Sequence, residues 1–142
     1  MSTFHTYLGY RDATAAHDWL GRVLGFEVTS SWPDDAGGIA HSELRRGDAG
    51  IVVFTDREGY ERPPLKGESC GLGLYLALEP DEVDAAWERA RAAGADVVWM
   101  LETSQWGNHR FRVLDPEGFE WTVGTFRPGV LAEPESAGQP GS

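Results

Sequence analysis

The sequence is poor in three features that would each have pointed to a class of protein. A single cysteine, Cys70, excludes an intramolecular disulfide and a cysteine-rich zinc site. No apolar run approaches the roughly 20 residues of a membrane-spanning helix. The N-terminal residues also lack the basic and apolar pattern of a signal peptide. We therefore expect a cytoplasmic protein with no membrane partner.

Positive charge is also scarce. The 142 residues include 12 Lys and Arg, of which Lys66 alone is lysine, against 23 Asp and Glu, so the formal net charge is −11. An acidic surface repels phosphate groups, and nucleic acid is therefore not an expected partner. Two explanations of the charge stay open: it aids solubility, or it attracts a cationic small molecule.

Apolar residues make up 41% of the chain, which is enough for a folded core. Their spacing changes from strand-like to helical and back, twice over. The first half predicts a strand at residues 3–10, a helix between Asp12 and Gly25, and strands at 26–32, 39–46 and 50–55. The second half predicts a strand at 71–78, a helix at 80–93, and strands at 96–101, 108–114 and 119–126. The repeat indicates an α+β fold of two tandem β-α-β-β-β modules.

Composition divides the chain into four segments. Residues 1–56 form the first module and residues 71–127 the second, and a polar linker at 57–70 joins them. Residues 128–142 are rich in Pro, Gly, Ser, Ala and Glu, so we expect a disordered tail there. One helix covers only one face of each sheet. The other face must therefore meet the second module, a partner chain or a ligand.

Alternation along the strands separates a core face from a cavity face. One face of the strand that opens the second module is entirely leucine, at Leu72, Leu74, Leu76 and Leu78. We expect that face to pack under the helix. The opposite face carries small residues and Tyr75, which suits the wall of a cavity. By the same alternation Glu120 and Thr122 face this cavity, and His5 and Tyr7 share one face of the first strand.

Several short motifs occur in a regular order in the two halves. They are Arg11-Asp12-Ala13, Leu24-Gly25-Phe26-Glu27, Asp84-Ala85-Ala86, Ala93-Gly94-Ala95, Trp106-Gly107, Asp115-Pro116-Glu117-Gly118 and Phe119-Glu120-Trp121-Thr122-Val123. With this order and spacing, residues 3–126 resemble the vicinal oxygen chelate superfamily, which includes glyoxalase I, extradiol dioxygenases and bleomycin-resistance proteins. The resemblance implies paired modules that form a curved mixed sheet around a U-shaped cavity, and a homodimer with sites at its interface.

The resemblance also implies where a metal would be held. The metal enzymes of the superfamily carry ligands on the first and last strands of the modules. His5 matches the first-strand position, but the equivalent residue of the second half is Gly73, and the last-strand glutamate position falls on Thr122. A catalytic metal generally needs about three protein ligands. Only His5, His41 and, with a shifted register, Glu120 are available, so we expect neither a metal nor another cofactor.

The incomplete set of metal ligands, the net negative charge and the six tryptophans favour the bleomycin-resistance branch of the superfamily. Trp19, Trp87 and Trp121 are assigned to the core. The other indoles offer flat surfaces for stacking and for cation–π contact, with Asp34, Asp35, Glu102 and Glu120 as partners for an ammonium group. We predict a protein that binds and sequesters an aromatic or cationic natural-product antibiotic. The predicted ligand-binding residues are His5, Tyr7, Trp32, His41, Phe54, Tyr75, Trp99, Trp106, Glu120 and Thr122.

Two alternatives stay open. The first is an enzyme of the same fold, either a metal-dependent glyoxalase or dioxygenase or a thiol transferase, in which a neutral histidine could act as a general base. The second is a regulatory partner of another protein that uses the acidic tail as its contact. The sequence itself does not identify the ligand.

Overall fold

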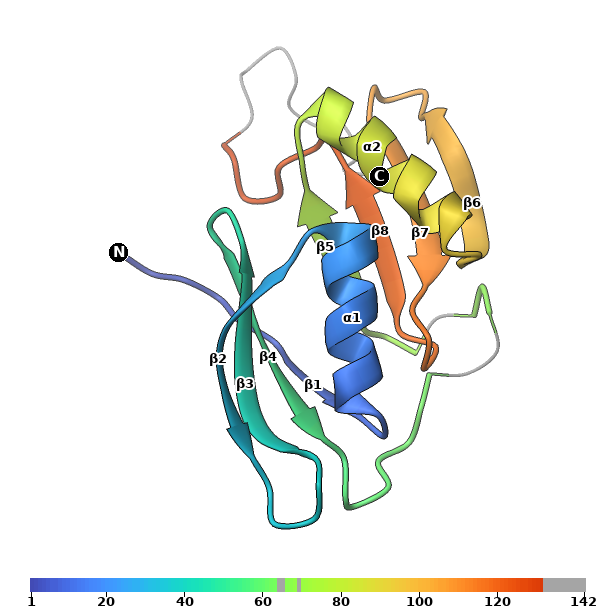
Figure 1. Ribbon diagram of the computed structural model, residues 1–142. Coiled ribbons are helices and arrows are strands. Elements are labelled where there is room, and N and C mark those ends of the chain that lie inside the picture. Colours follow the sequence, from blue (N-terminus) through green and yellow to red (C-terminus); the bar gives the residue numbers. More distant parts are fainter. Residues whose placement is uncertain (64–65, 69, 132–142) are drawn as a thin grey trace.

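The computed structural model describes residues 1–63, 66–68 and 70–131, so most of the expected tail lies outside the described residues. The elements repeat the order strand, helix and three strands. They are β1 (Tyr7–Tyr10), α1 (Ala13–Leu24), β2 (Glu27–Pro33), β3 (Ile39–Arg46), β4 (Ala49–Thr55), β5 (Leu74–Ala77), α2 (Pro80–Ala92), β6 (Asp96–Thr103), β7 (His109–Leu114) and β8 (Glu120–Gly124). The predicted α+β fold of two β-α-β-β-β modules is confirmed (Figure 1).

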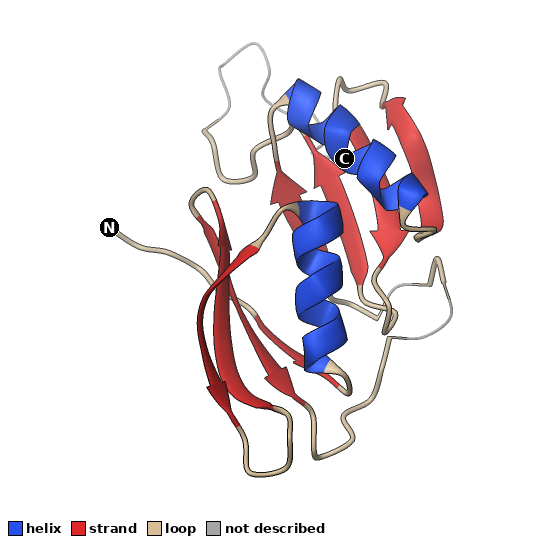
Figure 2. Ribbon diagram, in the orientation of Figure 1, coloured by secondary structure: helices blue, strands red, loops and turns tan. Residues whose placement is uncertain are grey.

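Each module forms a four-stranded mixed sheet of its own. The strand orders are β1-β4-β3-β2 and β5-β8-β7-β6. In both sheets the first strand pairs in parallel with the last strand of its module, β1 with β4 and β5 with β8, while the other pairs are antiparallel. The expected curved sheet is thus built from two sheets, each with a helix on one side (Figure 2).

Local signals set the ends of both helices. The Asp12 carboxylate accepts a hydrogen bond from the Ala15 backbone N–H at 3.0 Å, and Gly25 ends α1 in the left-handed conformation with φ of 78°. Pro80 occupies the first turn of α2, where its fixed φ suits a helix start. Neither helix of the described chain is long and apolar enough to cross a membrane.

The two helices lie side by side and join the modules in one core (Figure 1). Trp19, Trp87 and Trp121 are buried, as predicted. Phe26 at the end of α1 packs on Trp121 of β8 with ring centroids 5.9 Å apart, and the Arg89 side chain of α2 donates to the Val23 carbonyl of α1 at 3.0 Å. The modules therefore contact each other through the helix sides of their sheets.

A buried carboxylate connects the modules at one end of this core. Asp115, in the turn before β8, accepts from the Tyr10 hydroxyl of β1 at 2.6 Å and from the Trp121 indole at 3.1 Å. Burial raises the pKa of Asp115. Burial and the neighbouring carboxylate raise the pKa of Tyr10 far above its usual value, so the hydroxyl keeps its proton and donates.

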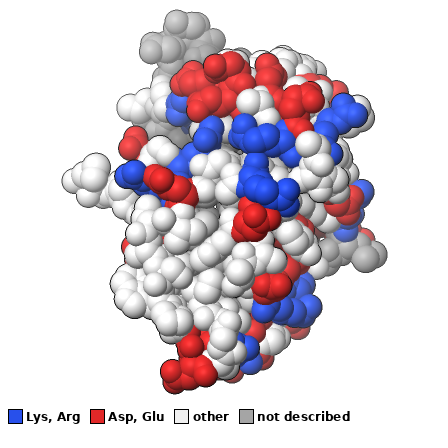
Figure 3. All heavy atoms as spheres, viewed as in Figure 1, with Lys and Arg blue, Asp and Glu red and all other residues white. Residues whose placement is uncertain are grey.

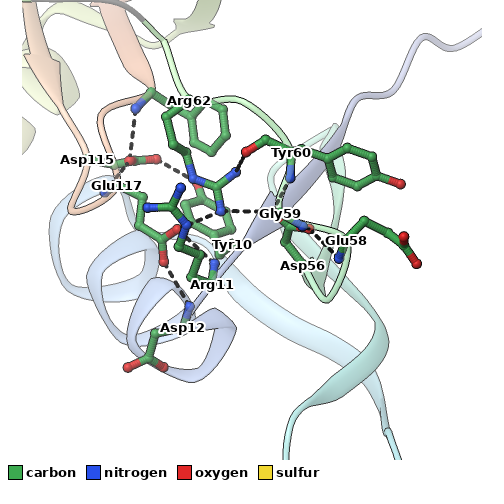
Figure 4. Close-up of polar contacts among 11 residues, drawn as sticks. Tyr10, Arg11, Asp12, Asp56, Glu58, Gly59, Tyr60, Arg62, Asp115 and Glu117 are labelled. Atoms are coloured by element: carbon green, nitrogen blue, oxygen red, sulfur yellow. Dashed lines mark hydrogen bonds and ion pairs between the residues drawn. The ribbon is translucent and has the colours of Figure 1, made fainter.

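Glu117 of the same turn holds the start of α1. Its two carboxylate oxygens accept from the backbone N–H groups of Arg11 and Asp12 at 2.7 and 2.8 Å. The guanidinium of Arg62, from the linker, bridges Glu117 and Asp56 at 3.1 and 3.2 Å (Figure 4). A carboxylate at the positive end of a helix is stabilising, so this contact fixes the second module against the first.

Three sequence-based expectations need correction. The opening strands begin at Tyr7 and Leu74 rather than at residues 3 and 71. Leu72 is therefore outside the sheet and 79% exposed instead of packing under the helix. The helical spacing of apolar residues in the sequence predicts that Ala15 lies on the buried face of α1, but Ala15 is exposed and Ala13 is buried instead. On α2 the same spacing predicts four inward residues, and all four are buried: Val83, Ala86, Trp87 and Ala90.

The helix-free faces of the two sheets are defined by strand alternation and register. On the first sheet, the side chains directed away from α1 are Tyr7, Trp32, His41, Glu43 and Phe54. On the second sheet, the side chains directed away from α2 are Tyr75, Trp99, Arg110, Arg112, Glu120 and Thr122. These helix-free faces carry the residues considered for function.

Tyr10→Phe tests the junction between the modules. Without the hydroxyl, the buried Asp115 carboxylate loses its shortest hydrogen bond, and such a loss costs about 1–3 kcal/mol. We expect the free energy of unfolding in urea to fall by that amount. Tyr60→Phe, at an exposed tyrosine, is the matched control and should leave stability unchanged. Equal stability of the two variants would contradict the importance of the contact.

Candidate functional site

A cavity of about 570 Å³ opens where the first strands of the two modules approach each other. Thr6, Tyr7 and Leu8 line it from the first module, and residues 71–75 line it from the second. The linker contributes Pro63, Gly67, Glu68 and Cys70. The remaining wall includes Arg112 of β7, Phe119, and Glu120 and Thr122 of β8. Its volume is in the usual range for a small-molecule site, and its lining combines aromatic groups with a few polar ones.

The polar groups of the cavity are tied together around Arg112. Its Nε donates to the Thr122 hydroxyl at 2.7 Å, and its Nη1 lies 3.6 Å from a Glu120 oxygen. The Arg112 guanidinium also stacks on Trp99, 3.5 Å from the ring centroid. Burial, followed by the neighbouring Arg110, lowers the pKa of Arg112, while Glu120 opposes the shift. Arg112 is thus held at the cavity wall by its contacts with Thr122, Glu120 and Trp99.

The second tyrosine of the site, Tyr75, stands beside this cluster on β5. Its ring is half-buried, and its hydroxyl donates to the Asn108 side-chain oxygen at 3.4 Å. Burial raises the pKa of Tyr75, so the hydroxyl remains a neutral donor. The backbone allows this approach because Gly124 has no side chain: a Cβ there would lie 2.6 Å from the Tyr75 hydroxyl.

Residues of the helix-free face of the first sheet gather in a separate group. Trp32 and His41 pack with ring centroids 5.5 Å apart, and His41 contacts Glu43 at 2.9 Å. Phe54 packs edge-on against Tyr60. The Nδ1 of His5 lies 2.8 Å from the Gly50 carbonyl, and its Nε2 lies 2.7 Å from the Thr3 hydroxyl. Both ring nitrogens of His5 are therefore engaged by its own chain.

The structure divides the ten residues predicted from the sequence into two main groups. Tyr7, Tyr75, Glu120 and Thr122 line the cavity. Trp99 lies beside it, under Arg112. Trp32, His41 and Phe54 belong to the first sheet and His5 precedes it, and none of the four lines the cavity. Trp106 lies in the loop between β6 and β7, where its backbone N–H donates to the Ser104 hydroxyl at 3.3 Å.

Sequence reasoning missed Arg110, Arg112 and Phe119. The signal was present in the strand His109–Leu114, because Arg110 and Arg112 alternate with the buried Phe111 and Val113. The same alternation that placed Thr122 in the cavity would have placed Arg112 there. Phe119 precedes its strand and packs edge-on against Tyr10, so periodicity alone could not place it.

The carboxylates expected to meet a cationic ligand mostly have arginine partners. Asp34 pairs with Arg57 at 2.8 Å, and backbone N–H groups, followed by Arg57, lower its pKa. Glu102 lies 3.6 Å from Arg110, as Glu120 does from Arg112. The strong net negative charge is therefore not concentrated at the cavity. Figure 3 shows acidic and basic groups interspersed over the second module on the face in view.

The residues present do not fit a catalytic divalent metal. Within the described part of the chain, no three His, Cys, Asp or Glu side chains come together as donors. In the cavity, Glu120 faces the positive charge of Arg112, and the Thr122 hydroxyl already accepts from that guanidinium. A divalent cation at Glu120 would be repelled by Arg112. No step of a reaction is therefore assigned to a metal.

Comparison with known proteins agrees with this fold. Two relatives of unknown function, from Mycobacterium bovis and Mycobacterium tuberculosis, are each 30% identical over 120 residues, which is 80% of this chain and 76% and 68% of theirs. The crystal structure of TioX from Micromonospora sp. ML1 is 31% identical, with a TM-score of 0.69, and the match covers 87% of this chain and 98% of TioX.

A more distant neighbour shares the fold alone. The fosfomycin resistance protein FosX of Listeria monocytogenes is 15% identical with a TM-score of 0.68, over 87% of this chain and 92% of FosX. At the level of the family, residues 3–123 match the one described as the Glyoxalase/Bleomycin resistance protein/Dioxygenase superfamily. The repeated β-α-β-β-β modules and this match over most of the chain lead to one conclusion: the chain belongs to the glyoxalase/bleomycin resistance protein/dioxygenase superfamily.

Proposed function

We propose that this protein binds and sequesters a planar aromatic natural product, as an antibiotic-binding member of its superfamily. The observation that carries the proposal is the cavity of about 570 Å³, which has tyrosines from both modules on its wall. Tyr7 is 68% exposed and Tyr75 is half-buried, so both rings are available for stacking. Binding alone would protect the target of the compound, with no chemical step.

The polar groups of the cavity support binding rather than turnover. The Thr122 hydroxyl accepts from Arg112, and the Tyr75 hydroxyl donates to Asn108, so both are already engaged in positioning side chains. A general base would need to reach a substrate proton directly or through one water molecule. His5 precedes β1 and His41 lies on the helix-free face of the first sheet, and neither lines the cavity. No histidine of the described residues lines the cavity, and the Glu120 carboxylate on its wall faces Arg112, so the site favours recognition over acid–base chemistry.

We also propose that the protein acts as a homodimer whose copies cover each other's helix-free faces. The first sheet presents Trp32, 53% exposed, beside His41 and Phe54, and no helix of the same module covers them. Exposed aromatic groups on one sheet face are typical of an interaction surface. In such a dimer, the first-sheet residues of one copy would complete the cavity of the other. The dimer would thus unite the two groups of predicted site residues.

Titration with planar aromatic antibiotics tests the binding proposal. Bleomycin, an anthracycline and a carboxylate-bearing quinolone, followed by calorimetry, should include at least one compound that binds with a stoichiometry near one per chain. Tyr75→Ala should raise its dissociation constant by about 10-fold or more, because truncating a buried aromatic anchor costs more than 1 kcal/mol. Arg22→Ala, on the exposed side of α1, is the control. Absence of binding across a broad panel would contradict the proposal.

The oligomeric state tests the dimer separately. Light scattering after gel filtration should give the mass of two chains for the wild type. Trp32→Asp should give one chain, because a carboxylate would be desolvated at the centre of the proposed interface. Thr14→Asp places the same charge on the exposed first turn of α1 and should stay dimeric. A wild type that is monomeric at micromolar concentration would rule out the dimer.

A further inference from the structure

Two arginines share the helix-free face of the second sheet with one tryptophan. Arg110 and Arg112 are two residues apart on β7, and Trp99 lies opposite Arg112 on β6. Their guanidinium carbons lie 4.6 and 3.5 Å from the centroid of the same indole ring. In a chain of net charge −11, with one lysine, such a pair beside the cavity is unexpected from composition.

The pair is incompletely neutralised by the chain itself. Among the described residues, the Nε and Nη1 of Arg110 are buried without a hydrogen-bond partner, and Glu102 lies 3.6 Å from Nη1. Arg112 has one short bond, to Thr122, and a 3.6 Å approach to Glu120. Buried charged donors are costly unless an acceptor is close. The unpaired donors belong to Arg110, which does not line the cavity, so they leave its positive charge incompletely neutralised beside a ligand bound there.

The two guanidinium groups also differ in access. The Arg112 side chain lines the cavity and is 28% exposed, whereas the Arg110 side chain is 14% exposed and lies behind it. Arg112 can therefore contact a ligand directly. Arg110 adds a second positive charge at short range, which strengthens the attraction for an anion in the cavity. Trp99 holds the plane of both groups by stacking.

We propose that Arg112, supported by Arg110 and Trp99, is a ligand-binding residue that receives the carboxylate of a planar aromatic acid. A guanidinium matches a carboxylate with two parallel N–H···O bonds, and Tyr7 and Tyr75 line the same cavity as Arg112. The inference rests on the proposed small-molecule binding and names its ligand class. It reverses the expectation of a cationic ligand that the acidic composition suggested.

A charge series on one aromatic ring tests this inference. The probes are naphthalene-2-carboxylate, the neutral naphthalene-2-carboxamide and the cationic 2-naphthylmethylammonium, each titrated into the full chain by calorimetry. The carboxylate should bind about 10-fold more tightly than the amide, as expected for charge-assisted hydrogen bonds. The ammonium compound should bind most weakly. Because all three comparisons use the wild type, they do not depend on the folding of a variant.

Variants then assign the preference to Arg112. Arg112→Gln should remove the advantage of the carboxylate over the amide. Arg112→Lys should keep only part of that advantage, because lysine retains the positive charge but not the two parallel N–H donors of the guanidinium group. Arg22→Gln, at an exposed arginine paired with Asp18, should keep the full advantage.

Three outcomes would overturn the inference. They are equal or tighter binding of the amide or the ammonium compound, no carboxylate binding at millimolar concentration, and a carboxylate preference that survives in a folded Arg112→Gln protein. None of them decides the proposed sequestration, which stands or falls with the antibiotic panel. Failure of the inference and failure of the proposed function are thus distinguishable.

Discussion

The buried carboxylate of Asp115 is the contact on which the arrangement of the two modules depends. It accepts from Tyr10 of the first module and Trp121 of the second, while its neighbour Glu117 accepts from the backbone at the start of α1. These bonds fix where β1 meets the second sheet. The cavity has residues of β1 on one wall and of β8 on another, so its shape follows from this junction.

The charge of the molecule is distributed differently from what its total suggests. The net negative charge is spread over a surface where acidic side chains repeatedly pair with the few arginines. Such exposed pairs contribute little to stability. At the cavity, however, the arginines are partly buried and stacked on Trp99, where electrostatic interactions are stronger. Under the proposed ligand class, local burial at the cavity outweighs the net charge of the chain in selecting the ligand.

Much of the fold could be predicted from the sequence because its signals are local. Alternating apolar and polar residues mark the strands, and the N-cap at Asp12 and the left-handed Gly25 mark the two ends of α1. The prediction failed at Leu72, where the leucine alternation continues although β8 pairs with β5 only from Leu74 onward. The start of β5 is set by its pairing with β8, which lies far away in the sequence. Such a pairing cannot be inferred from the residue pattern of one strand alone.

The candidate site was less predictable, for two physical reasons. A charged residue on a strand normally indicates a solvent-exposed face, so the sequence pattern did not single out Arg110 and Arg112. Both nevertheless alternate with the buried Phe111 and Val113. The separation of Trp32 and His41 from the cavity depends on how the modules pack through α1 and α2, which no local pattern encodes. In the proposed dimer, a second copy of the chain would bring these residues back to the site.

A crystal structure of the protein grown with naphthalene-2-carboxylate tests the central claim, that the helix-free faces form the binding site, most directly. The account predicts a carboxylate within hydrogen-bond distance of Arg112, a ring between the tyrosines of the cavity, and a second copy covering the first sheet. A ligand bound elsewhere, with both helix-free faces open to solvent, would contradict it.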